Sequence, residues 1–102
     1  MTSYTQTVRS RALAGRETEY LDWYVATHMP AVLDLDGFVS GELHRLVSDE
    51  DAPAEFLCIY RIETTDLAAT QAAMLQAGAG MVPSEAMDVP ATQIDFFVGV
   101  DA

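Results

Sequence analysis

Residues 56–62 have the sequence Phe-Leu-Cys-Ile-Tyr-Arg-Ile, and this short stretch decides the fold class. Its length and its β-branched and aromatic residues are typical of a strand. Apolar side chains occupy both faces of that strand, with Phe56, Cys58, Tyr60 and Ile62 on one face and Leu57 and Ile59 on the other. A sheet with one face in water alternates apolar and polar residues. The stretch therefore predicts a strand that is covered on both sides.

The segments around this strand predict a regular order of elements. Alternating residues predict further strands over 4–11, 38–47 and 93–100. A stripe of Tyr20, Leu21, Tyr24, Val25 and His28 predicts a helix over 17–28, which Pro30 is expected to end before a turn or short helix over 30–35. Asp66 can cap a second helix over 66–77, with Leu67, Met74 and Leu75 facing inward. Residues 48–55 are expected to form an exposed loop, and residues 81–92 an irregular segment.

The resulting order is strand-helix-strand-strand-helix-strand, which is the ferredoxin-like α+β pattern. We expect a single domain over residues 1–102, with a four-stranded antiparallel sheet and both helices on one face. The last strand repeats the two-faced pattern, because Ile94, Phe96, Val98 and Val100 lie opposite Phe97. Two helices cover only one face of such a sheet. We therefore expect a homodimer that forms through the sheet faces around a two-fold axis.

Charge and composition exclude several classes of partner. The net charge is −11, the pI is near 4.1, and all five basic residues are arginines. So acidic a surface repels nucleic acids and anionic membranes. The single cysteine, Cys58, excludes an internal disulfide framework. No apolar run approaches the roughly 18 residues of a membrane span, and no secretory signal is visible, so we expect a cytoplasmic protein.

Several segments carry a family resemblance. These are Trp23-Tyr24-x-x-x-His28-x-Pro30, then Asp36-Gly37-Phe38-Val39-Ser40 with Arg45-Leu46, and later residues 57–66 and 81–88. Together they resemble the dimeric α+β barrel superfamily, and more narrowly its EthD-like and related uncharacterised members. That superfamily includes isomerases, polyketide cyclases, cofactor-free monooxygenases and haem enzymes. The resemblance thus implies a fold and leaves the reaction open.

Tyr24 and His28 are the predicted catalytic residues. They lie four positions apart and therefore project from one face of the helix, toward the sheet. A histidine can exchange a proton near neutral pH, and a tyrosine can donate a hydrogen bond to a developing oxyanion. The alternative is structural: a core tyrosine, and a histidine whose nitrogens bind backbone carbonyls near the end of the helix.

Further residues are predicted to bind substrate. His44 is placed on the same face of its strand as Phe38, with a pairing to Glu42 as the alternative role. Arg61 is expected to hold a substrate anion or else to form an internal ion pair. The remaining candidates are Tyr60 and either Phe96 or Phe97 as pocket walls, and Ser84 and Asp88 at the open end of the pocket, where ordinary loop capping is the alternative.

These residues favour an acid/base enzyme that needs no cofactor. We expect an isomerase, cyclase or lyase acting on a small apolar or aromatic carbonyl or phenol compound, in aromatic compound catabolism. One alternative is a non-catalytic binding or accessory protein of a catabolic pathway, and another is a cofactor-free monooxygenase. The sequence has no cluster of metal ligands and no phosphate-binding or dinucleotide motif, so we expect neither a metal nor a cofactor.

Overall fold

The computed structural model describes residues 1–49 and 51–100 of the chain. Its elements are β1 (Thr2–Arg11), α1 (Glu17–Trp23), η1 (Tyr24–His28), α2 (Met29–Leu33), β2 (Phe38–Arg45), β3 (Glu55–Thr64), α3 (Leu67–Gly78), η2 (Val89–Ala91) and β4 (Gln93–Val98). The predicted order of strands and helices is confirmed. The predicted loop over 48–55 lies between β2 and β3, and its residue Glu50 lies outside the described residues.

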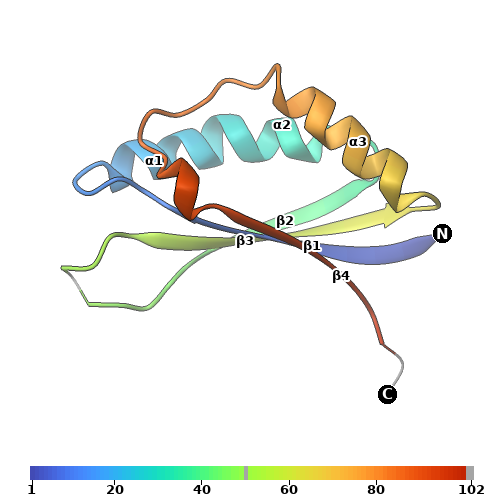
Figure 1. Ribbon diagram of the computed structural model, residues 1–102, viewed down its shortest axis with the longest axis horizontal. Coiled ribbons are helices and arrows are strands. Elements are labelled where there is room, and N and C mark those ends of the chain that lie inside the picture. Colours follow the sequence, from blue (N-terminus) through green and yellow to red (C-terminus); the bar gives the residue numbers. More distant parts are fainter. Residues whose placement is uncertain (50, 101–102) are drawn as a thin grey trace.

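The four strands form one antiparallel sheet in the order β2-β3-β1-β4. Figure 1 shows that the helices all lie on one face of this sheet and leave the other face uncovered. The ferredoxin-like α+β architecture predicted from the sequence is therefore confirmed. The homodimer that the sequence predicts remains a prediction.

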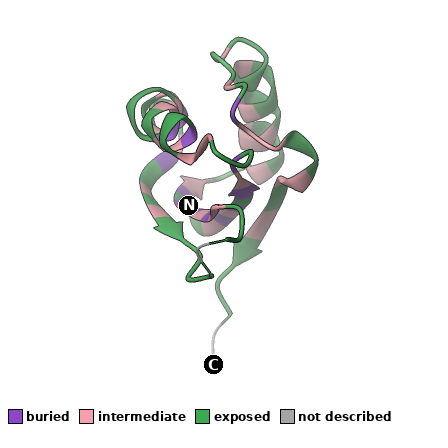
Figure 2. Cartoon of the chain, turned by 90° about the vertical axis from the view of Figure 1, so that its left-hand side faces the viewer, coloured by how far each residue is buried: buried purple, intermediate pink, exposed green. Residues whose placement is uncertain are grey.

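The core fills the space between the helices and the sheet (Figure 2). The central strands supply alternate residues to it, because successive side chains on a strand point to opposite faces. The helical layer contributes Tyr20, Tyr24 and Val32. The buried residues of β1 and β3 on this face are Gln6, Val8, Ser10, Phe56, Cys58, Tyr60 and Ile62. Two of these seven residues, Gln6 and Ser10, are polar.

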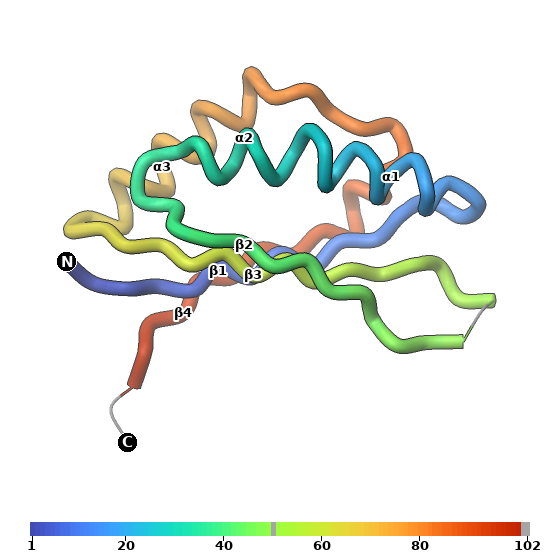
Figure 3. Tube along the Cα trace, turned by 180° about the vertical axis from the view of Figure 1, so that it is seen from behind, coloured from blue at the N-terminus to red at the C-terminus, as the bar shows by residue number. Residues whose placement is uncertain are grey.

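The first helical segment does not end before Pro30, so that prediction is wrong. Backbone angles stay helical from Trp23 through Met29, and the chain continues into α2 (Figure 3). The intervening η1 is a π-helix in which the Met29 N–H donates to the Tyr24 carbonyl, five residues back. This wider turn leaves room for the proline ring, which would otherwise clash with a preceding carbonyl.

The second long helix, α3, begins as predicted and faces the core along a different stripe. The Asp66 side chain accepts a hydrogen bond from the Ala69 N–H at 3.1 Å and caps the first turn. Leu75 is 72% exposed, so its predicted inward position is wrong. The half-buried side chains are Leu67, Thr70, Gln71, Met74 and Ala77. This stripe has helical spacing, and Leu75 lies one position off it.

A β-bulge in β2 changes which residues share a face of the sheet. The register with β3 shifts between Phe38 and Ser40. Phe38 is buried on the helix side, whereas His44 is exposed. The expectation that these two residues share a face is wrong, because the one extra residue at the bulge inverts the alternation that follows it.

Candidate functional site

A pocket of about 320 Å³ lies between the helices and the sheet. We call it the helix-sheet pocket. Its walls are mainly apolar and include three methionines. The lining residues are Gln6, Val8, His28, Val32, Tyr60, Met74, Leu75, Gly78, Met81, Met87, Thr92 and Ile94. A smaller hollow of about 200 Å³ shares His28, Gly78, Met81 and Met87 with it. His28 thus borders two adjoining cavities.

Four residues of this pocket carry buried polar atoms that have no hydrogen-bond partner among the described residues. The atoms are Gln6 Oε1, His28 Nδ1, Tyr60 OH and Thr92 Oγ1. Buried polar groups in proteins are nearly always paired, and each unpaired one costs about 1–3 kcal/mol. Such atoms gathered around one apolar cavity are typical of a ligand site, where a bound molecule supplies the missing partners.

The His28 side chain is held by aromatic neighbours at the end of η1. Its ring stacks on Trp23 with 4.8 Å between the ring centroids and meets the edge of Tyr24 at 5.0 Å. Burial lowers the pKa of His28, because a low-dielectric environment disfavours the charged form. The imidazole is therefore neutral at neutral pH, which is the state that can accept a proton.

The two buried tyrosines differ in their relation to the pocket. Tyr60 lines it, whereas Tyr24 is 2% exposed and packs behind His28. Burial raises the pKa of both tyrosines, so both stay protonated and can donate. The predicted pair Tyr24 and His28 is in contact, and only His28 reaches the pocket.

Gln6 and Thr92 are pocket residues that the sequence analysis did not identify. Gln6 is 2% exposed, and its Nε2 donates to Met74 Sδ at 3.2 Å. Gln6 lies two residues before Val8 on β1, so both side chains point to the same face of the sheet, toward the core. This shared alternation was the one sequence feature that could have indicated a buried Gln6. Thr92 lies in the segment before β4, where no periodicity points to the pocket.

The segment 79–88 borders the pocket and is held by hydrogen bonds from side chains of β1 and α1. The Trp23 Nε1–H donates to the Val82 carbonyl at 2.9 Å. Arg11 donates to Asp88 Oδ2 from Nε at 3.1 Å and from Nη2 at 2.9 Å. Ser84 Oγ accepts from the Ala86 N–H at 3.1 Å, and Ser84 borders the smaller hollow. The Asp88 carboxylate is thus already paired, and substrate binding by either residue remains a prediction.

Three predicted substrate-binding residues lie on the uncovered face of the sheet. His44 and Arg61 are exposed, and Phe97 is 54% exposed. His44 Nε2 lies 3.3 Å from Glu42, and Arg61 lies 3.6 Å from Glu63. The expectation that Phe97 shares the pocket of Tyr24 and His28 is wrong, because alternate residues of a strand point to opposite faces.

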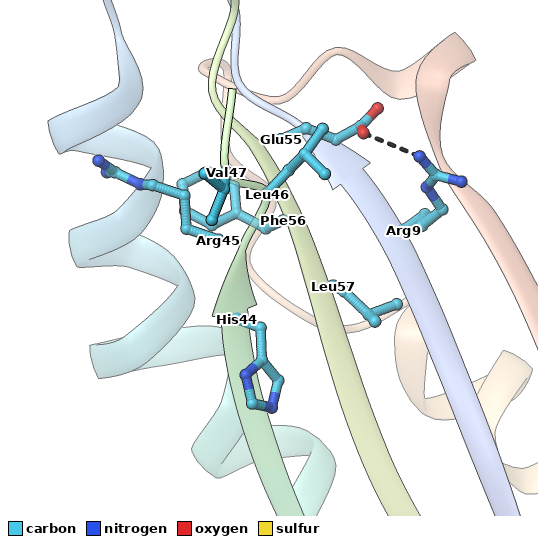
Figure 4. Close-up of a pocket in the computed structure, with 8 residues that line it drawn as sticks. All are labelled: Arg9, His44, Arg45, Leu46, Val47, Glu55, Phe56 and Leu57. Atoms are coloured by element: carbon cyan, nitrogen blue, oxygen red, sulfur yellow. Dashed lines mark hydrogen bonds and ion pairs between the residues drawn. The ribbon is translucent and has the colours of Figure 1, made fainter. Parts of the chain in front are cut away.

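The uncovered face has a hollow of its own, of about 510 Å³, at the end of the β2–β3 hairpin (Figure 4). His44 is among its lining residues. Its Arg9 and Glu55 side chains form an ion pair at 2.9 Å. Neither the four partnerless atoms of the helix-sheet pocket nor the Tyr24 hydroxyl, which is also buried without a partner, belongs to a residue of this hollow. The chemical groups that await a partner therefore lie on the helix side of the sheet.

Two further properties concern metals and membranes. Over residues 1–49 and 51–100, no three His, Cys, Asp or Glu side chains gather as metal ligands would. Among the described helices, none is both long and apolar enough to cross a membrane. The expectation that the protein uses no metal and no cofactor remains a prediction.

Comparison with solved structures identifies proteins of the same fold. One is the heme-degrader MhuD from Mycobacterium tuberculosis, solved with two hemes in its active site, with a TM-score of 0.67, 17% identity and 97% of each chain covered. The cofactor-independent oxygenase SnoaB from Streptomyces nogalater has a TM-score of 0.62 and 15% identity over 100% of this chain and 97% of that one. An EthD family protein from Bacillus halodurans has a TM-score of 0.61 and 10% identity over 95% and 99%.

These likenesses establish the fold and no more, because all three identities are low. They confirm the resemblance to the dimeric α+β barrel and EthD-like proteins at the level of fold. No protein-family model matches the sequence, and the search of curated proteins found no match.

A haem does not fit the residues of the pocket. Haem propionates need cationic partners, and none of the residues lining the helix-sheet pocket or its smaller neighbour is an arginine. The nearby Arg11 is paired with Asp88. We therefore assign no step to a haem.

Proposed function

We propose that the helix-sheet pocket binds a small, largely apolar molecule and that His28 removes a proton from it. The observation that carries this proposal is the buried, partnerless Nδ1 of His28, a residue that lines an apolar cavity. The lowered pKa of His28 supports it, because a neutral imidazole is the form that acts as a base.

The other polar groups of the pocket suit the anion that such a step produces. The hydroxyls of Tyr60 and Thr92 have no partner and can donate to a developing oxyanion. The raised pKa of Tyr60 keeps its proton in place for this purpose. The walls are mainly apolar, so a bound ligand that displaces water from them makes each hydrogen bond to the anion stronger than it would be in solution. Tyr24 acts here as a positioning residue, since it packs against the His28 ring.

The same first step serves more than one reaction. Proton removal from a carbon next to a carbonyl or from a phenol yields an enolate or phenolate, which an isomerase, cyclase or lyase then reprotonates or rearranges. SnoaB, which has this fold, is a cofactor-independent oxygenase, and this favours the cofactor-free monooxygenase as the second candidate. The third candidate is a protein that binds such molecules without turnover.

The uncovered sheet face supports a homodimer as part of the same proposal. Leu57 and Ile59 on β3 and Phe97 on β4 lie on a surface that no helix covers, with Thr5, Thr7 and Arg9 of β1 between the two strands. A second copy would bury these three apolar side chains, together with His44 and Arg61. These two residues would then lie between the two sheets, where their predicted contribution to substrate binding can be tested.

The experiment exploits the presence of two histidines on opposite faces of the sheet. The protein is supplied with polyhydroxylated aromatics and with 1,3-dicarbonyl compounds, without added cofactor. Oxygen uptake is followed with an electrode, and product formation by absorbance. We expect His28→Gln to lower turnover by about 100-fold or more, because a positioned base contributes at least that much.

The His44→Gln variant decides which face carries the reaction. A loss of turnover in His44→Gln with normal turnover in His28→Gln contradicts the proposal and moves the site to the uncovered face. Oxygen uptake that follows the turnover identifies the monooxygenase candidate, and turnover without oxygen uptake identifies the isomerase type. Binding of the probes at His28 without any turnover identifies the binding protein.

A further inference from the structure

We propose that Gln6 makes the helix-sheet pocket selective for ligands that carry a hydrogen-bond donor, such as a hydroxyl or N–H group on an otherwise apolar frame. This inference rests on the proposed role of the pocket as a binding site. It adds the polarity of the molecule that the pocket accepts, and the residue that recognises it.

The orientation of the Gln6 amide follows from its neighbour. The amide nitrogen lies 3.2 Å from Met74 Sδ, and a thioether sulfur accepts hydrogen bonds and cannot donate them. The nitrogen must therefore face the sulfur. The amide oxygen is left without a partner in a side chain that is 2% exposed.

An amide oxygen differs from the other partnerless groups of the pocket. The hydroxyls of Tyr60 and Thr92 can donate or accept, and the role of His28 Nδ1 depends on the tautomer. Gln6 Oε1 can only accept. Like the unprotonated Nδ1 through which His28 would act as a base, it requires a donor from the ligand, and an ether, a ketone or a hydrocarbon leaves it unpaired.

The pocket wall can open toward this oxygen. The group that packs against the Gln6 amide is Met74, whose unbranched side chain has three rotatable bonds and adapts easily to a bound molecule. Gln6 also lies directly across the sheet from Tyr60, at adjacent positions of β1 and β3. A ligand hydroxyl that donates to Gln6 is therefore placed beside the Tyr60 ring.

The test uses a pair of probes, 2-naphthol and 2-methoxynaphthalene, in which a methyl group replaces the hydroxyl hydrogen and removes the donor. Affinities are measured by isothermal titration calorimetry at neutral pH, where 2-naphthol is not ionised. We expect the unmodified protein to bind 2-naphthol about tenfold or more tightly than the ether, because the ether leaves a buried oxygen unpaired. Gln6→Met should lose most of this preference. Gln93→Met, the same change at an exposed residue of β4, should keep the preference.

A second measurement guards against loss of folding. Gln6→Met removes a partnerless buried oxygen, so its melting temperature should equal or exceed that of the unmodified protein; a large fall would instead indicate a structural role and overturn the proposal. Equal binding of both probes by the unmodified protein overturns the role of Gln6 and leaves the pocket as a binding site. Binding of neither probe overturns the proposed function, and the inference with it.

Discussion

Gly41 offers a direct test of how firmly the pocket wall is fixed. It lies opposite Tyr60 in the sheet, and a Cβ added at this position would lie 3.0 Å from Tyr60 Cδ1 and Cε1 and 3.3 Å from Met29 Cε. These distances are shorter than ordinary carbon–carbon contacts. The Tyr60 ring is 1% exposed and packs edge-on against Phe38 at 5.8 Å, so it has little room to retreat. Gly41→Ala must therefore displace the ring toward the pocket.

Overpacking of this kind costs about 1–3 kcal/mol. Replacing glycine by alanine also gains about 0.4–1 kcal/mol, because the unfolded chain loses conformational freedom. Gly99→Ala shares that gain and has nothing within 4 Å of its added Cβ, so it is the matched control. We expect Gly41→Ala to be less stable than Gly99→Ala by about 1–3 kcal/mol in urea unfolding and to bind pocket probes more weakly. Equal stability of the two variants would refute the close packing of Tyr60 and, with it, the defined shape of the pocket.

Three further outcomes are expected. The free energy of unfolding should rise with pH through the region below about 6.5, because burial lowers the pKa of His28 in the folded state and its neutral form favours that state. This contribution to stability is fully present above the unfolded-state pKa and is lost as the pH falls toward the folded-state pKa. Urea unfolding over this range should show the rise, and His28→Gln should flatten it. Sedimentation equilibrium at micromolar concentration should give twice the chain mass of 11.1 kDa, whereas a well-folded monomer would contradict the dimer. Purified protein should carry no stoichiometric metal or haem, and elemental analysis with a visible spectrum tests this.

The order of elements could be predicted because it depends on local patterns. The apolar, β-branched and aromatic residues of 56–62 and the cap at Asp66 act within a few residues of themselves, and the strand and the helix start that they predict are both confirmed. The end of the first helix could not be predicted in this way. A proline normally stops a helix, and here a π-turn just before Pro30 accommodates it.

The site was predicted less completely than the fold, because the face of the sheet on which a side chain lies depends on the register between strands. One bulged residue in β2 separates His44 from Phe38, and a single register shift is enough to move a side chain to the other face. Gln6 was missed because a lone polar residue in a strand ordinarily indicates a face in water. Its unpaired oxygen is visible only when its neighbours in space are known.

The π-turn at η1 also predicts how this chain tolerates insertions and deletions. A π-turn holds one residue more than a regular turn, so deleting one residue between Tyr24 and His28 would restore ordinary α-helical hydrogen bonds. The π-turn and the ordinary turn each complete about one full rotation, so the deletion would leave the relative orientation of α1 and α2 nearly unchanged. Trp23 and His28, five residues apart here, would become four apart, the spacing that places two side chains on one face of an α-helix. Natural variants of this chain that lack this one residue should therefore keep both the fold and the aromatic setting of the histidine.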